Sequence, residues 1–330
     1  MNCSLYIKAT TKAFLFSLFS FILVDLHAQI DQAKVAAFKA SMIEKGNYQA
    51  EALDKVLASA EYDQTIIDKI SKPAEGTMTW GRYRRIFIQP ERIQAGVDFW
   101  NEHESTLNAV SEESGVPVEI ILGIMGVETF FGQRIGSYRV LDALYTLAFG
   151  YPKRSKFFTS ELEKFLELSQ KENIDITSIK GSYAGAIGYA QFMPSSYLAY
   201  AKSFDDDGSR NLMEPKDAIA SIANYLREHR WEKGAPITQE ISNISNSNPS
   251  GSKSVKPANT LKYYSDQGYA PSGNLTPSLK ASIVELEGEE GMEYWFGFFN
   301  FYVITRYNHS PLYAMAVYQL AQEIKYSRQE

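Results

Sequence analysis

Apolar residues recur three or four positions apart along most of the first two thirds of the chain, which predicts amphipathic helices. Ser155 is expected to cap the start of one helix, and Pro117 to occupy the first position of another. Gly115 is expected to end a helix, and Ser310 with Pro311 to begin the last one. Further helices are predicted over residues 33–44, 50–60, 90–114 and 215–229.

The composition changes at Pro236. Residues 236–277 are rich in Ser, Asn, Gly and Pro, which is typical of loops with short strands. Two β-type segments, 281–287 and 292–298, follow as a predicted hairpin. The sequence therefore predicts a mainly α fold, with residues 29–235 and 298–330 forming a helical region and residues 236–297 a loop-rich, β-containing accessory insertion.

The N-terminus has the pattern of a secretory signal peptide over residues 1–28. Lys8 and Lys12 precede an apolar stretch, and Ala28 offers a small residue at the cleavage point. An uncleaved N-terminal anchor is the alternative. Cys3 precedes the apolar core, so it is not placed as a lipoprotein cysteine, and cleavage leaves a chain without cysteine. We expect an exported protein of the periplasm or cell envelope that does not span the membrane after signal removal.

The net charge of the chain limits the classes of molecule that it is expected to bind. The chain has a net charge of −6 and no basic cluster, so it lacks the electrostatic footprint of a nucleic-acid-binding protein. Its 21 tyrosines would suit a sugar-binding cleft, since sugars offer apolar faces and hydroxyl edges. Aromatic residues are, however, more often part of a core than of a site.

A single glutamate, Glu128, lies in a stretch, residues 115–132, in which nearly every other side chain is apolar or glycine. Ile121, Ile124 and Met125 precede it on the same helical face, so its carboxyl group should point toward the core. Apolar surroundings favour the protonated carboxyl group, which suits a general acid. The alternative is a structural glutamate satisfied by backbone amides or by an arginine.

A second dense segment, residues 181–197, carries three glycines at short spacing together with Gln191. Glycines in this pattern imply a close approach of the backbone to a ligand or to another element. No strong strand precedes the segment, so it is not a dinucleotide-binding fingerprint. Packing between helices is the structural alternative.

Four motifs together closely resemble the lytic murein transglycosylase B family, glycoside hydrolase family 103. They are Gly-Val-Glu-Thr at 126–129, Leu-Asp-Ala-Leu at 141–144, the segment Ser-Tyr-Ala-Gly-Ala-Ile-Gly-Tyr-Ala-Gln-Phe-Met-Pro-Ser-Ser-Tyr at 182–197, and Thr-Arg-Tyr-Asn at 305–308. The resemblance spans residue 33 to the C-terminus. It implies a lysozyme-like helical catalytic core that binds peptidoglycan strands and cleaves the MurNAc-β-1,4-GlcNAc bond without water, leaving a 1,6-anhydro end.

The resemblance also implies roles for individual residues. Glu128 would be the sole catalytic carboxylate, and no cofactor would be required for the chemistry. Ser182 and Gln191 would orient Glu128 or the substrate. The residues expected to line the glycan groove are Tyr83, Tyr225, Tyr307, Asn308 and Tyr313.

One carboxylate suffices only if the substrate supplies its own nucleophile, because hydrolysis by inversion or retention needs a second carboxylate. The acidic residues nearest in sequence are Glu119 and Asp142, and Asp142 is expected to be structural. Two alternatives stay open. One is a muramidase that uses water, and the other is a non-catalytic peptidoglycan-binding envelope protein.

Residues 203–214 fit a twelve-residue calcium loop. Gly208 stands at position six, and Ser203 is a weak residue at position one, where Asp is expected. A structural Ca²⁺ is therefore a candidate ligand, against the alternative of a solvated acidic turn. The expected metal ligands are Asp205, Asp207, Ser209 and Glu214.

Overall fold

The computed structural model describes residues 30–46, 48–72, 78–172, 174–205, 207–241 and 243–329. The predicted signal peptide, residues 1–28, lies outside this range. None of the helices within the described ranges combines the length and apolar character needed to cross a membrane.

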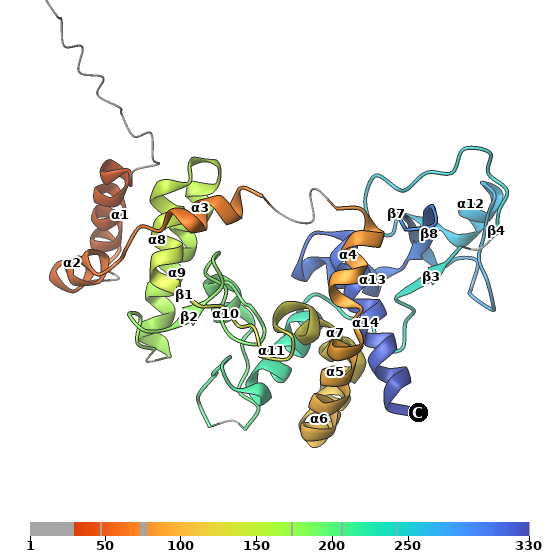
Figure 1. Ribbon diagram of the computed structural model, residues 1–330, viewed down its shortest axis with the longest axis horizontal. Coiled ribbons are helices and arrows are strands. Elements are labelled where there is room, and N and C mark those ends of the chain that lie inside the picture. The colour runs from red at the N-terminus through yellow and green to blue at the C-terminus, as the bar shows by residue number, and fades with distance from the viewer. Residues whose placement is uncertain are drawn as a thin grey trace, which may run out of the picture.

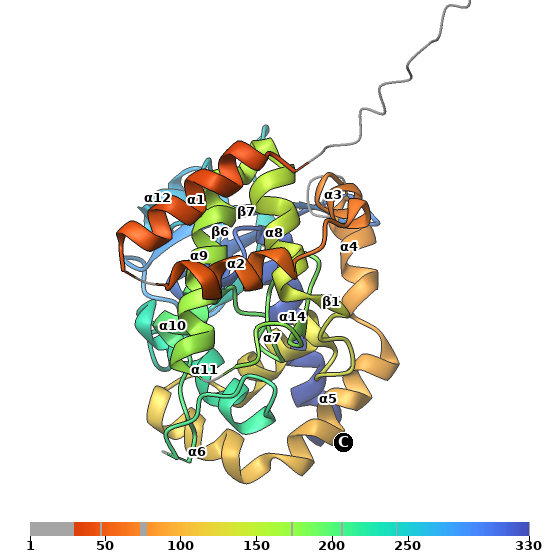
Figure 2. The ribbon, with the colours of Figure 1, turned by 90° about the vertical axis from the view of Figure 1, so that its left-hand side faces the viewer.

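Helices dominate the structure, which confirms the predicted mainly α fold. They begin with α1 (Gln32–Glu44), α2 (Ala50–Ala58), α3 (Gln64–Ile70), α4 (Trp80–Phe87), α5 (Pro90–Glu102), α6 (Glu104–Ser114) and α7 (Val118–Thr129). They continue with α8 (Val140–Gly150), α9 (Ser155–Lys171), α10 (Pro194–Tyr200), α11 (Pro215–Glu228), α12 (Leu261–Asp266), α13 (Phe299–Tyr307) and α14 (Pro311–Gln329). Helices α1, α2, α8 and α9 gather at one end of the molecule (Figures 1 and 2), and the strands within residues 238–297 lie at the other end (Figure 1).

Three local predictions were wrong. The helix expected over residues 90–114 is broken at His103, which ends α5 and precedes α6. Ser155 is not a cap but the first residue of α9, and its hydroxyl donates to the Ala148 carbonyl at 2.6 Å. Pro117 is the N-cap of α7, with extended backbone, so Val118 takes the first helical position. Gly115 does end α6 in the left-handed conformation that favours glycine.

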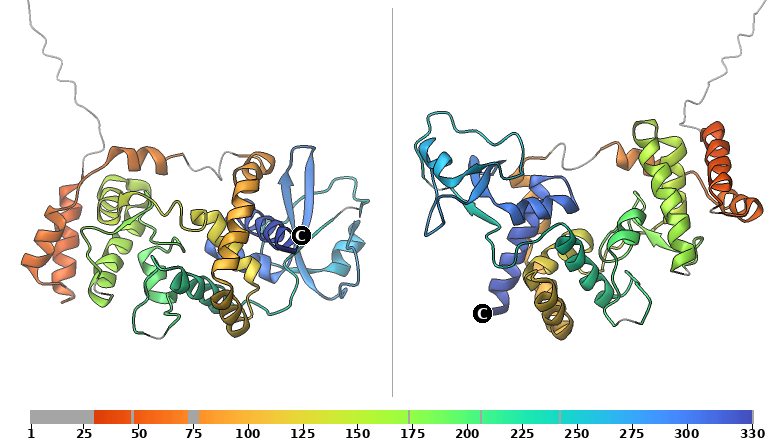
Figure 3. Two further views of the ribbon diagram at one scale, coloured as in Figure 1. Left: turned by 60° about the horizontal axis from the view of Figure 1, so that its bottom comes forward. Right: turned by 180° about the vertical axis from the view of Figure 1, so that it is seen from behind.

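Helix α7 lies between the two ends of the molecule and is almost entirely buried. It packs tightly against α14, where a Cβ added at Gly123 would lie 2.4 Å from the Val317 carbonyl oxygen. Only glycine allows the two helix backbones to come this close. The two helices therefore lie side by side (Figure 3).

An antiparallel sheet of order β3-β8-β7-β5 forms most of the region after α11. Its strands are β3 (Thr238–Glu240), β5 (Asn259–Thr260), β7 (Lys280–Glu287) and β8 (Met292–Gly297), and β7 with β8 is the predicted hairpin. Short strands β4 (Asn243–Ile244) and β6 (Tyr269–Ala270) pair separately, as do β1 (Tyr138–Arg139) and β2 (Lys180–Gly181).

Strand β7 joins two hydrophobic cores, because side chains alternate between the faces of a strand. Ala281 and Ile283 pack into a small core within the insertion. Val284 and Leu286 face the other way, into the main helical core. The insertion is therefore attached to the helices by an apolar surface as well as by its two chain connections.

The hairpin turn also reaches α4. A Cβ added at Gly81 would lie 2.9 Å from the Glu289 backbone nitrogen, and Arg85 forms an ion pair with Glu289 at 3.1 Å. Gly81 and Arg85 flank Tyr83 on this helix. The insertion thus helps to fix the position of Tyr83.

Candidate active site

Glu128 lies at the C-terminal end of α7, next to the last helical residue. Its carboxyl oxygen Oε1 accepts a hydrogen bond of 2.6 Å from the hydroxyl group of Tyr313 on α14. Tyr313 is 2% exposed, and burial together with the Glu128 charge raises its pKa well above the usual value of 10. At physiological pH this tyrosine therefore keeps its proton and remains a donor to Glu128.

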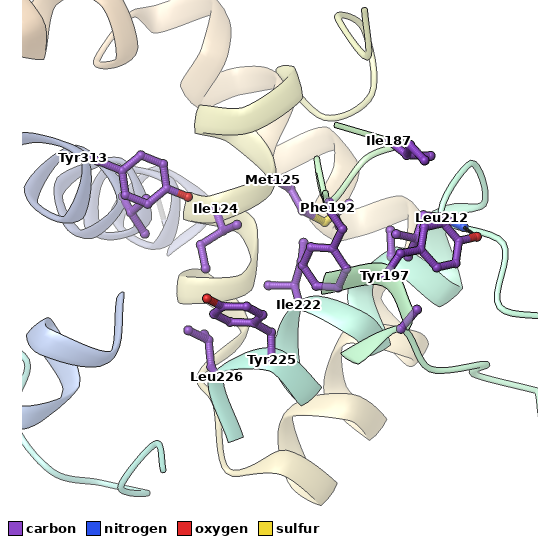
Figure 4. Packing of buried hydrophobic residues seen from close by; sticks show 14 of the residues in the cluster. Ile124, Met125, Ile187, Phe192, Tyr197, Leu212, Ile222, Tyr225, Leu226 and Tyr313 are labelled. Atoms are coloured by element: carbon purple, nitrogen blue, oxygen red, sulfur yellow. Dashed lines mark hydrogen bonds between the residues drawn. The ribbon is translucent and has the colours of Figure 1, made fainter. Parts of the chain in front are cut away.

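Further aromatic rings extend from this contact. Tyr307 stacks on Tyr313 with ring centroids 6.4 Å apart and an angle of 10° between the planes. Tyr225 lies 4.8 Å from Tyr307, and Phe192 lies 5.7 Å from both. Tyr225 and Phe192 also pack beside Ile124 of α7 (Figure 4). The rings form a continuous wall that begins at Glu128.

The hydroxyl groups of Tyr307 and Tyr225 both donate to backbone carbonyls. Tyr307 donates to the Ala190 carbonyl at 2.5 Å, and Tyr225 donates to the Arg306 carbonyl. Burial raises the pKa of both, with the Glu128 charge as the second cause at Tyr307. Tyr225 is 7% exposed and its hydroxyl is bonded to a backbone carbonyl, so this hydroxyl supports the fold even though the ring belongs to the wall.

Tyr83 and Asn308 complete the set predicted for the groove. Tyr83, on α4, is 2% exposed, and α4 packs against α14, the helix that carries Tyr313. Asn308 follows Tyr307 directly and ends α13 in an extended conformation. The structure thus brings residues from α4, α7, α11, α13 and α14 together at one site.

Ser182 and Gln191 lie in the glycine-rich loop between β2 and α10. The Ser182 hydroxyl oxygen accepts two backbone N–H groups of the loop, at 3.1 and 3.3 Å. The Gln191 amide donates to the carbonyls of Gly188 and Ile135, at 2.9 and 3.2 Å. Gln191 has a φ of +48°, a conformation that is costly for a non-glycine residue and recurs at functional sites.

Thr129 was not singled out from the sequence, yet it holds the end of α7 in place. It is fully buried, and its hydroxyl group lies 3.3 Å from the Met125 and Tyr189 carbonyls and accepts the Gly132 N–H at 3.0 Å. Phe130 and Phe131 then adopt left-handed backbone conformations. Its position directly after Glu128 was the only sequence signal for this role.

The two alternative carboxylates are engaged elsewhere. Glu119, at the start of α7, forms an ion pair with Lys325 at 2.7 Å. Asp142 accepts hydrogen bonds from Arg139 Nε and from the Glu61 N–H, each at 2.8 Å. Asp142 therefore ties α8 to the segment before α3, which confirms the structural role predicted for it.

In the acidic loop at residues 203–214, Gly208 has a φ of +84°, in keeping with the sharp turn that glycine makes at position six of a calcium loop. Asp207 accepts hydrogen bonds from the Ser203 hydroxyl and the Ser209 N–H, at 3.1 and 2.8 Å. Asp205 forms an ion pair with Lys216 at 3.5 Å. Across the part of the chain that the structure describes, no three Asp, Glu, His or Cys side chains converge as metal ligands. Two of the expected ligands, Asp205 and Asp207, therefore have partners within the protein.

Asp217 was not predicted as a site residue, and it anchors this loop to α11. Its two carboxyl oxygens accept the Phe204 N–H at 2.9 Å and the Asn211 N–H at 2.7 Å. Asp217 lies in the first turn of α11, and an acidic residue just after Pro215 is a recognisable helix-start signal.

The chain matches the family described as "Transglycosylase SLT domain" over residues 31–322. It is 44% identical over 280 residues to "Membrane-bound lytic murein transglycosylase B" of Escherichia coli (strain K12), covering 85% of this chain and 76% of that protein. The match confirms the resemblance found in the sequence.

Solved structures of lytic transglycosylases are also similar to this chain. The soluble lytic transglycosylase SltB1 of Pseudomonas aeruginosa is 45% identical with a TM-score of 0.83, covering 90% of this chain and 100% of that one. Escherichia coli Slt35, solved in complex with calcium, is 41% identical with a TM-score of 0.83, covering 90% and 94%. A more distant structure, Pseudomonas aeruginosa SltB3 in complex with NAG-NAM-pentapeptide, is 28% identical with a TM-score of 0.76, covering 89% and 79%. The chain therefore belongs to the transglycosylase SLT domain family, alongside the lytic murein transglycosylases B.

Proposed function

We propose that this protein is a peptidoglycan lytic transglycosylase in which Glu128 acts first as general acid and then as general base. The observation that carries the proposal is the position of Glu128, on an apolar helix and hydrogen-bonded to a buried tyrosine. Family membership supports the reaction class, since the relatives are named as lytic transglycosylases.

In the first step, protonated Glu128 donates its proton to the oxygen that links MurNAc to GlcNAc. The bond between MurNAc C1 and that oxygen breaks, and the GlcNAc hydroxyl leaves. Tyr313 donates to Oε1 of Glu128, and this bond stabilises the carboxylate that forms as the proton leaves. The fixed hydrogen bond also limits rotation of the carboxyl group, so the acid is held ready for transfer.

In the second step, the Glu128 carboxylate takes the proton of the MurNAc C6 hydroxyl, and that oxygen attacks C1. The acetamido group of the same sugar stabilises the positive charge that develops at C1. The product is a 1,6-anhydro ring, and no water is consumed. Proximity of the C6 hydroxyl replaces the second carboxylate that hydrolysis would need.

The remaining residues are assigned to substrate binding. Tyr83, Tyr225, Tyr307, Asn308 and Tyr313 form or support the aromatic wall of the groove. Ser182 accepts two N–H groups, which directs its own hydroxyl proton away from the loop and toward a ligand or Glu128. Gln191 holds the glycine-rich loop in shape.

We also propose the organisation and location of the chain. Residues 29–235 with 298–330 act as the catalytic region, and residues 236–297 as an accessory insertion that carries its own small core. An N-terminal segment of signal-peptide type supports an exported protein of the periplasm or cell envelope.

Glu128→Gln should reduce lysis of purified murein by a factor of about 100 or more, since general acid–base catalysis contributes roughly 10²–10⁴-fold. Glutamine keeps the volume, so the melting temperature should stay close to that of the wild type. Glu119→Gln makes the same change on the same helix at a residue paired with Lys325, and it serves as the control. A Glu128→Gln rate within tenfold of the wild type would remove Glu128 from the catalytic role and favour a glycan-binding module.

Tyr313→Phe should lower kcat about tenfold or more while leaving the fold intact, because a hydrogen bond to a charged group contributes about 1.5–3 kcal/mol. Tyr318→Phe, on the same helix and with its pKa raised only by burial, is the matched control and should stay within about twofold of the wild type. Steady-state digestion of glycan strands measures both variants. Equal kcat values for Tyr313→Phe and the wild type would contradict the role given to this hydrogen bond.

We propose that the loop at residues 203–214 binds Ca²⁺ through Asp205, Asp207, Ser209 and Glu214, as a stabilising ion outside the reaction. The turn at Gly208 and the calcium complex of Slt35 support this site. Binding would require Asp205 to leave Lys216, so the affinity should be low.

Millimolar Ca²⁺ should therefore raise the melting temperature of the wild type, since a ligand that binds the native state stabilises it. Asp205→Asn should abolish that shift. Asp266→Asn, an exposed acid of α12 in the insertion, should retain it. An unchanged melting temperature of the wild type at millimolar Ca²⁺ would favour the solvated acidic turn.

A further inference from the structure

Two arginines without a carboxylate partner lie beside the C-terminal end of α7. Arg92, on α5, is 6% exposed, and its Nη1 donates to the Gly126 carbonyl at 2.9 Å. Its Nε is buried and has no hydrogen-bond partner. Arg134 is exposed and follows α7 in the chain. Within the described ranges, neither guanidinium group forms an ion pair with an acidic side chain.

The ring of Phe130 contacts the guanidinium groups of both Arg92 and Arg134. The centre of the Arg92 guanidinium group lies 4.7 Å from the centroid of Phe130, and that of Arg134 lies 5.1 Å from it. Cation–π contacts of this kind stabilise each cation but leave its charge uncompensated. Burial and the Arg134 charge lower the pKa of Arg92 to about 10, so both groups remain positive at neutral pH. Two neighbouring positive charges without a counter-ion favour an anionic ligand.

The pair lines a cavity of about 380 Å³ that is open to solvent. The cavity lies between the end of α4, the start of α5 and the turn that follows α7. Its other polar lining residues are Gln89 and Glu91, and Ile86 and Phe130 supply apolar surface. Glu91 is the one carboxylate in this lining, so the cavity has two positive charges and one negative charge.

A chain of ring contacts connects the cavity to the site at Glu128. Tyr83 lies 5.0 Å from Phe87 on the same helix, and Arg92 lies 5.1 Å from Phe87. Phe130, whose ring contacts both guanidinium groups, is two residues from Glu128. A glycan strand bound at Glu128 would therefore have this cavity at the edge of its groove.

We propose that the Arg92–Arg134 cavity binds a carboxylate of the peptide stem that MurNAc carries. This inference rests on the proposed function, because it takes peptidoglycan as the substrate. The sugar rings are neutral, whereas the stem peptide has free carboxylates and extends sideways from the glycan strand. Guanidinium groups are the side chains best suited to bind carboxylates in a fixed geometry. The cavity gives the enzyme a way to distinguish peptide-bearing strands from bare glycan.

The test compares glycan strands that carry peptide stems with strands from which an amidase has removed them. Arg134→Gln should raise KM for peptide-bearing strands about tenfold, equivalent to roughly 1.4 kcal/mol. Its KM for stripped strands and its kcat on both should match the wild type. Arg227→Gln is the control, because Arg227 is an exposed arginine at the end of α11 whose guanidinium group donates to Asn224. An equal rise in KM on both substrates, or no rise on either, would overturn the proposal.

Direct binding separates this proposal from the catalytic one. Calorimetry with the free stem peptide needs no cleavage, so it remains informative if the protein proves to have no lytic activity. The wild type should bind the peptide, and both Arg134→Gln and amidation of the peptide carboxylates should weaken binding about tenfold. Acetate or phosphate binding as tightly as the peptide would show a site for small anions only and would contradict a stem-peptide site.

Discussion

The arrangement of this protein depends on holding one carboxyl group at the end of an apolar helix, where a buried phenol donates a hydrogen bond to it. A carboxylate loses hydration when it is placed against apolar side chains, and a fixed hydrogen bond offsets part of that cost. Tyr313 supplies this bond to Glu128 at 2.6 Å, from a position 185 residues away in the sequence. The rest of the fold can be understood as the framework that brings these two side chains together.

Several elements contribute to that framework. Gly123 lets α14 approach α7, so that Tyr313 reaches the end of the helix. Thr129 ties the same end of α7 to the glycine-rich loop. Strand β7 attaches the insertion to the helical core, and the hairpin turn packs on α4, which carries Tyr83. The accessory insertion therefore supports the groove from outside, although it supplies none of the residues assigned to catalysis.

The sequence predicted those parts of the structure that depend on local patterns. Apolar spacing predicted the long helices, two β-type segments bracketed by Gly288 and Gly291 predicted the β7–β8 hairpin, and Gly115 was correctly expected to end α6. The break at His103 has no Gly or Pro to mark it, and Ser155 bonds to the preceding helix instead of capping its own. Local patterns cannot show tertiary partners.

The same limit applied to the site. The motifs identified Glu128 and the tyrosines as a set, but the contacts among them join residues far apart in the chain. The Arg92–Arg134 pair had no sequence signature, since 42 positions separate the two arginines and only the fold places both on Phe130. Asp217 was not predicted, because it lies in α11, outside the twelve residues of the expected calcium loop.

The account depends most on the claim that a single carboxylate performs both proton transfers while the substrate supplies the nucleophile. Mass spectrometry of the products from purified murein tests this claim most directly. The account predicts fragments that end in 1,6-anhydro-MurNAc, each lighter by one water than the hydrolytic product. Fragments ending in reducing MurNAc as the main product would contradict it, because they would require a second carboxylate within about 10 Å of Glu128 to activate water.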